Sequence, residues 1–79
     1  MEYLIDQIRN YIAAMEEIDV QEIDADSHIV KDIGMSSIDI IEMMCHFGAE
    51  YGLPLENNVE LNLSTVRSVA EFIHKASSQ

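Results

Sequence analysis

Basic residues are scarce in this sequence. Its 79 residues hold only four Lys and Arg against 15 Asp and Glu, which gives a formal net charge of -11. Clusters of Lys and Arg bind nucleic acids and anionic membrane surfaces, whereas Arg9, Lys31, Arg67 and Lys75 stand singly along the chain. The composition therefore argues against nucleic acid and membrane partners, and we expect the acidic surface to attract basic proteins.

Cysteine and long apolar runs are also scarce. Cys45 is the single cysteine, so no internal disulfide can form. No uninterrupted apolar run approaches the ~20 residues that cross a bilayer, and the N-terminus lacks the charged segment and apolar core of a secretory signal. We expect a soluble, monomeric, cytoplasmic protein with no membrane span.

The length leaves room for one small domain. A chain of this size buries only about 60–65% of its unfolded surface, which allows one core but not a large enclosed active site. Because 48% of the residues are hydrophobic and periodic, the acidity does not indicate disorder. We therefore expect a single domain over residues 1–79 that is not an enzyme.

Apolar spacing predicts an all-α fold, a small bundle of three long helices and one short helix. The long helices are expected near 2–17, 37–51 and 65–76, and a short turn of helix near 57–61. The expected core residues recur every three or four positions: Ile8, Ile12, Ile40, Met43, Phe47, Val66, Val69 and Ile73. The connection from 18 to 36 is a long loop, a length that is often functional, and four apolar residues can pin it to the core: Ile23, Ile29, Val30 and Ile33.

The second helix has the clearest signals at its ends. Ser36 can cap its first turn, and Asp39 can reach back to complete a capping box. Gly52 and Pro54 then end it, because Gly accepts a left-handed backbone and Pro lacks the amide that would continue the helix.

The same helix is more apolar than one buried face requires, since seven of the ten positions from 38 to 47 are apolar. We expect four apolar residues on its flanks, at least some of them facing solvent or a partner: Ile38, Ile41, Met44 and Cys45. A polar stripe runs beside them: Asp39, Glu42, His46 and Glu50. An apolar strip beside an acidic one suggests docking, although a central helix and a solvated acidic face would give the same pattern.

Ser37 falls in the first turn of this helix, where free amides and the positive end of the helix dipole favour an attached phosphate. On this pattern alone, the simpler interpretation is that Ser36 and Ser37 are only capping residues. The segments Asp26-Ser27, Lys31-Asp32-Ile33-Gly34, Ser36-Ser37-Ile38-Asp39 through Glu50-Tyr51-Gly52, and Leu63-Ser64-Thr65-Val66 supply the wider context. Over nearly its whole length the chain resembles an acyl carrier protein.

The resemblance implies a carrier function. Ser37 would receive a 4′-phosphopantetheine arm from a phosphopantetheinyl transferase, and the arm would hold acyl groups as thioesters for enzymes of fatty acid, polyketide or related biosynthesis. These acyl-transferring or acyl-activating enzymes would present basic surfaces to the second helix. The residues expected at that contact are Ile38, Asp39, Ile41, Glu42, Met44, Cys45 and Glu50.

Two positions depart from the family's pattern. Ser36 stands where an Asp usually precedes the modified serine, and Ile38 stands where Leu or Met usually follows it. A hydroxyl preserves the helix cap but not the charge, so a transferase that reads the carboxylate would act less well on this chain. Ser36 fits the pattern less well as the modified residue, because Met35 would then stand at the position of the Asp and Ser37 at the position of the Leu or Met.

Other chemistries have little support. The three histidines are 18 and 28 residues apart, which is no zinc spacing. Asp24, Asp26 and His28 imitate the start of a calcium loop, but Ile29 replaces its Gly and Met35 its final Glu. We therefore expect no metal site. The alternative to a carrier is an unmodified acidic helical adaptor that binds a basic protein, with a small hydrolase a distant third.

Overall fold

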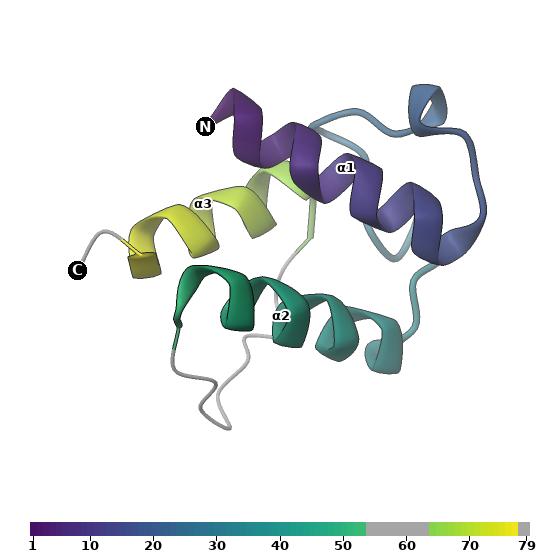
Figure 1. Cartoon of the computed structure of the whole chain (residues 1–79). Helices are drawn as coiled ribbons and strands as arrows, with labels where there is room; N and C mark the ends of the chain where they lie inside the picture. Colours follow the sequence, from purple (N-terminus) through teal and green to yellow (C-terminus); the bar gives the residue numbers. More distant parts are fainter. Residues whose placement is uncertain (54–63, 78–79) are drawn as a thin grey trace.

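The computed structural model describes residues 1–53 and 64–77, which form three long helices and one short one (Figure 1). They are α1 (Glu2–Glu16), the 3-10 helix η1 (Val20–Glu22), α2 (Ser37–Tyr51) and α3 (Val66–Ser77). The three predicted long helices are thus confirmed to within one residue at each end. The turn expected at 57–61 lies outside the described residues. Within the described part of the chain the only bridge of β type is an isolated antiparallel one between His28 and Thr65.

Local chemistry explains where the helices begin and end. Ser36 caps α2 by accepting a hydrogen bond from the backbone N–H of Asp39, and the Asp39 carboxylate accepts one from the N–H of Ser36, so the predicted capping box is present. Gly52 ends α2 with a φ of 66°, as expected. Thr65 caps α3 by accepting from the N–H of Ser68. The cap, the capping box and the terminal glycine predicted for α2 are therefore all present.

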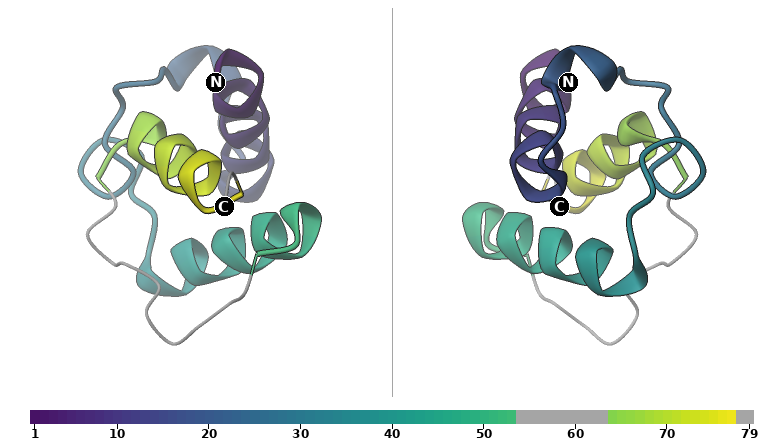
Figure 2. Two further views of the ribbon diagram at one scale, coloured as in Figure 1. Left: turned by 90° about the vertical axis from the view of Figure 1, so that its left-hand side faces the viewer. Right: turned by 90° about the vertical axis from the view of Figure 1, so that its right-hand side faces the viewer.

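Each long helix packs against the other two, and the core lies between them (Figures 1 and 2). The eight predicted core residues are all buried: Ile8, Ile12, Ile40, Met43, Phe47, Val66, Val69 and Ile73. Phe47 and Ile73, whose joint exposure would have contradicted the bundle, are 2% and 0% exposed. The apolar spacing therefore identified the faces that meet.

Two expectations about exposure are wrong. Met44, expected on the flank of α2, is only 3% exposed. Because α2 packs against α1 and α3 together, its buried face is wider than a single seam and includes Met44 beside Met43. Val30, expected to pin the loop, is 48% exposed, and the loop is held by Ile23 and Ile29 with partial help from Ile33.

The connection from α1 to α2 is fastened at several points. Arg9 donates hydrogen bonds to the carbonyls of Val20 and Ile23. The N–H of Ile29 donates to the carbonyl of Ser64 at 2.7 Å, and the N–H of Arg67 donates to that of Ala25 at 2.8 Å. These bonds tie a loop of irregular backbone to α1 and to the start of α3.

A second set of bonds closes the loop just before α2. The Nδ1 atom of His28 accepts from the N–H groups of Val30 and Lys31, and the His28 N–H donates to the carboxylate of Asp32. The N–H of Met35 donates to the carbonyl of Ile29 at 2.9 Å, and Met35 is buried. The chain therefore enters α2 from a fixed position.

Candidate functional site

Ser37 is the first residue of α2, and its side chain is exposed, as expected. The capping hydrogen bonds are made by Ser36 and Asp39, so the cap does not depend on the Ser37 hydroxyl. Buried Met35 on one side and buried Ile40 on the other hold the chain to the core. The serine pair therefore stands on the surface between two fixed points.

The start of α2 suits a phosphoester. The first turn of a helix presents backbone N–H groups that lack helical partners, and the helix dipole places partial positive charge there. The Asp39 carboxylate is half-buried and is already engaged by the N–H of Ser36 at 3.4 Å. An exposed hydroxyl on Ser37 thus meets the requirement for a bulky phosphate-linked group, which needs open space on one side and favourable charge on the other.

An exposed strip continues from Ser37 along α2. We call the residues Ile38, Ile41, Glu42 and Cys45 the outer strip; all four are exposed, with Ile38 at 75% and Ile41 at 45%. Glu50 is also exposed, one turn beyond the strip. Of the residues expected at a partner contact, the structure therefore leaves these five open, Asp39 half-buried and Met44 in the core.

Aromatic side chains border the strip where α2 meets α1. The rings of Tyr11 and His46 stack with centroids 4.5 Å apart, and Phe47 meets both rings edge-on. Nε2 of His46 lies 3.3 Å from a carboxylate oxygen of Glu50. Burial raises the pKa of the Tyr11 hydroxyl, and nearby Glu42 and Cys45 raise it further. Sequence reasoning missed this cluster, because nothing local in either helix pairs Tyr11 with His46.

The end of α1 also reaches the site, since it lies close to the start of α2 (Figures 1 and 2). Burial raises the pKa of the carboxyl of Glu16, the last residue of α1, and Asp39 raises it further. Sequence reasoning missed Glu16 as well. The two residues are 23 positions apart, and no short-range pattern connects them.

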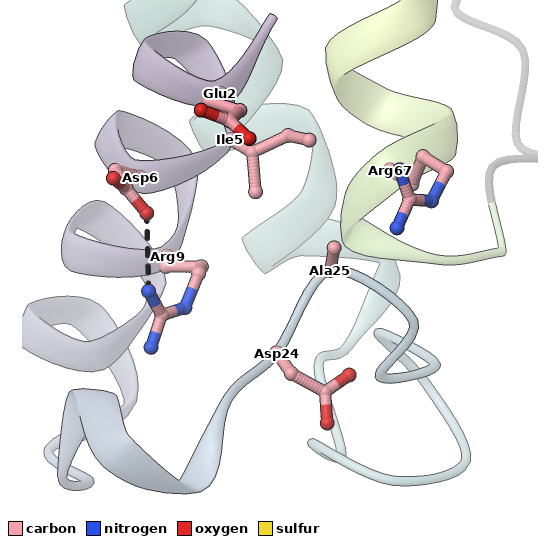
Figure 3. Close-up of a pocket in the computed structure, with 7 residues that line it drawn as sticks. All are labelled: Glu2, Ile5, Asp6, Arg9, Asp24, Ala25 and Arg67. Carbon is pink, nitrogen blue, oxygen red and sulfur yellow. Dashed lines mark hydrogen bonds and ion pairs between the residues drawn. The ribbon is translucent and has the colours of Figure 1, made fainter.

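A separate groove of about 500 Å³ lies between α1, the loop and the start of α3 (Figure 3). Arg9 and Arg67 come from opposite walls, and Glu2, Asp6 and Asp24 supply the opposing charge. Arg9 is paired with Asp6 at 3.1 Å, and Arg67 is paired with Asp26 at 3.1 Å. No residue of α2 lines this groove, so it is not part of the surface around Ser37.

Residues 1–53 and 64–77 lack two further features. No helix there combines the length and apolar character that crossing a membrane requires. No group of three or more His, Cys, Asp or Glu side chains in the same residues is arranged to hold a metal ion.

The fold and the site define a small helical domain with an exposed pair of serines at the start of its second long helix. Comparison with known proteins gives the family: the sequence matches the family described as "Phosphopantetheine attachment site" over residues 6–73, and the chain belongs to it. Phosphopantetheine is therefore the cofactor of this domain, and the family's members are carrier proteins.

The fold is similar to a solved solution structure, described as the apo doublet acyl carrier protein from prodigiosin biosynthesis. The TM-score is 0.76 at 20% sequence identity, and the match covers 94% of this chain. It covers 36% of the other chain, so the present chain spans about a third of that protein's length. At this identity the comparison supports the fold.

Proposed function

We propose that the chain is an acyl carrier protein whose 4′-phosphopantetheine arm is attached to Ser37. The single observation that carries this assignment is the exposed Ser37 side chain in the first turn of α2, beside a cap formed by Ser36. When attached, the arm supplies a thiol that holds acyl groups as thioesters. Family membership supports the cofactor, and the local geometry supports the residue.

The residues of the chain act by presentation. The capping box fixes the first turn, so Ser37 is held in one place while its hydroxyl is open to a transferase. Buried Met35 and Ile40 prevent the turn from peeling away from the core. Catalysis in this proposal belongs to the transferase and to the enzymes that load and unload the arm.

Partner enzymes dock on the outer strip of α2. Ile38 and Ile41 supply apolar contact area close to the arm, and Cys45 extends it along the helix. The Glu42 carboxylate in the strip, and Glu50 beyond it, attract basic surfaces and raise the rate of encounter. The strong excess of acidic residues in the chain supports partners with basic surfaces. Enzymes of fatty acid, polyketide or related biosynthesis are the class proposed, in the cytoplasm, with the carrier as a monomer.

Intact-mass measurement after coexpression with phosphopantetheinyl transferases tests the assignment. The wild-type chain should gain the mass of one phosphopantetheinyl group, and Ser37→Ala should remain unmodified while it keeps the helical circular dichroism of the wild type. Ser27→Ala is the matched control, because it removes a hydroxyl from the loop and should leave modification intact. Peptide mapping that places the arm on Ser36 would refute the assignment of Ser37 as the attachment site.

The alternative function is an unmodified acidic adaptor that uses the outer strip alone. The exposure of Ile38 and Ile41 supports the adaptor as well as the carrier, since an apolar docking surface does not require a phosphopantetheine arm. The absence of any mass increase with several transferases, together with binding of a basic partner by Ser37→Ala, would favour the adaptor.

A further inference from the structure

His28 closes the turn that leads into α2, and it does so with both its ring and its backbone. Its Nδ1 atom accepts the N–H groups of Val30 at 3.2 Å and Lys31 at 3.0 Å. Its carbonyl oxygen accepts those of Asp32 at 2.9 Å and Ile33 at 3.0 Å. Four consecutive backbone N–H groups therefore bond to this one residue.

The ring can make its two bonds in one protonation state only. A neutral imidazole has one nitrogen that accepts and one that donates, whereas the charged imidazolium carries hydrogen on both. Because Nδ1 of His28 accepts two N–H groups, the arrangement requires the neutral ring with its hydrogen on Nε2. A proton on Nδ1 would remove both bonds and direct three N–H groups at one another.

We propose that His28 is a proton-sensitive cap, which holds the entry to α2 in place while its ring is neutral and releases it when the ring is protonated. The turn leads directly to the serine pair. Ile29, the next residue, accepts the N–H of buried Met35 at 2.9 Å, and Ser36 follows Met35. His28 is therefore a positioning residue for Ser37. This consequence rests on the proposed function, whereas the cap is a property of the unmodified protein.

The chain before the turn is fastened independently of the ring. The N–H of Ile29 donates to the carbonyl of Ser64 at 2.7 Å, and Ile29 is buried. The N–H of Val66 donates to the carbonyl of Ser27 at 3.2 Å. Neither bond uses the ring of His28. Loss of the ring bonds therefore loosens the segment that leads to α2, while the chain before it stays attached to the start of α3.

The charged groups near His28 do not replace its lone pair. Its β bridge with Thr65 places the turn beside the start of α3. Between residues 26 and 33 and between residues 64 and 68, the charged residues are Asp26, Lys31, Asp32 and Arg67. Arg67 pairs with Asp26 at 3.1 Å, and Lys31 is exposed. The Asp32 carboxylate accepts the backbone N–H of His28 at 2.8 Å. A nearby carboxylate attracts a proton, but it does not accept the two N–H groups that Nδ1 would release.

The effect of pH on stability has a definite sign. Histidine ordinarily gains its charge as pH falls from about 8 to about 5, and the unfolded chain takes up that proton at no structural cost. In the folded protein the same proton costs two hydrogen bonds, so the unfolded state binds more protons over this range. The contribution of the cap is therefore fully present at the upper end of the range and is lost as pH falls.

Thermal unfolding of the unmodified protein between pH 7.5 and 5.5, above its isoelectric point of about 4.2, tests the cap. His28→Asn keeps a side-chain oxygen that accepts N–H groups in turns and does not ionise. On acidification from pH 7.5 to 5.5, the wild type should lose about 4–8 °C of melting temperature relative to this variant. A difference between the two proteins that stays constant over the range would overturn the proposal.

His46→Asn is the matched control, because it makes the same exchange at a histidine with different surroundings. Nε2 of His46 lies 3.3 Å from a carboxylate oxygen of Glu50, so a proton on this ring gains an ion pair. On acidification the wild type should therefore lose no melting temperature relative to His46→Asn. An equal loss relative to both variants would overturn the role of His28, since the pH dependence would then belong to neither ring in particular.

Nuclear magnetic resonance of the wild type tests the cap without any variant. At pH 7.5 the nitrogen-15 signals of the His28 ring should show hydrogen on Nε2 and none on Nδ1. The opposite tautomer, or a ring that stays neutral down to pH 5.5, would overturn the proposal. The amide signals of Val30 and Lys31 should move as the ring titrates, and those of Ser36 and Ser37 should move in step. Serine amides that do not respond would refute the positioning role.

The transferase assay separates this inference from the proposed function. If Ser37 is modified, the ratio of the modification rate of the wild type to that of His28→Asn should fall several-fold from pH 7.5 to 5.5. The ratio cancels the pH dependence of the transferase itself, so a ratio independent of pH would refute the positioning role. If Ser37 is never modified, the proposed function fails, while the unfolding and resonance measurements still decide whether His28 is a proton-sensitive cap.

Discussion

The inner and outer faces of α2 have similar apolar side chains and opposite environments. Ile40 is 5% exposed and Ile38 is 75% exposed, although the two isoleucines are two residues apart on the same helix. The inner face is covered by α1 and α3 together, whereas the residues of the outer strip are exposed. Apolar character in this helix therefore serves two purposes, and only the inner face stabilises the bundle.

The largest expected effect is on stability at the centre of the inner face. Phe47→Ala should lower the free energy of unfolding by about 3–5 kcal/mol, because it leaves a cavity where a fully buried ring packs. Ile38→Ala on the outer strip should change the same quantity by less than about 0.5 kcal/mol. Chemical denaturation of both variants checks the contrast, and similar losses would erase the distinction between the two faces.

Met44 sharpens the boundary between the faces. Since its side chain is buried, Met44→Ala should cost about 2–5 kcal/mol of stability, whereas Ile41→Ala, at 45% exposure, should cost much less. Binding kinetics with a partner enzyme give the complementary measurement: Ile41→Ala should speed dissociation. A Met44→Ala variant that keeps its stability but dissociates faster from the partner would show that Met44 belongs to the contact surface.

The next effect concerns the turn where the two faces begin. Ser36→Ala removes the cap and should cost about 1 kcal/mol, measured by denaturation. Ser36→Asp keeps a capping oxygen and should therefore retain most of the stability lost in Ser36→Ala. If the missing carboxylate limits a generalist transferase, Ser36→Asp should also be modified faster than the wild type. An unchanged modification rate would dismiss the carboxylate as the obstacle.

The smallest effect on the fold is expected from the charges of the outer strip. Glu42→Lys should leave stability nearly unchanged, because Glu42 is exposed, but should slow association with a basic partner several-fold. Added salt should slow association of the wild type as well, since the Debye length falls from ~10 Å at 0.1 M to ~3 Å at 1 M. Stopped-flow binding at two salt concentrations measures both effects. Rates that respond to neither change would leave the acidic residues as a solvated face.

Local sequence patterns are sufficient to predict the three long helices and the two ends of α2. The bounds of α2 follow from Ser36, Asp39 and Gly52, and the buried stripe of each helix follows from residues three and four positions apart. These features depend on interactions within about one helical turn, so local patterns contain them. The position of Ser37 in the first turn of α2, and its exposure, are likewise features that the local pattern predicts.

Tertiary structure alone decided the rest. Met44 is buried because α1 and α3 both cover α2, and the pattern of one helix does not reveal how many neighbours it has. The ring of Tyr11 stacks on that of His46, which lies 35 residues further along the chain. Such contacts depend on how whole helices are placed, which is set by the packing of the entire core rather than by any short segment.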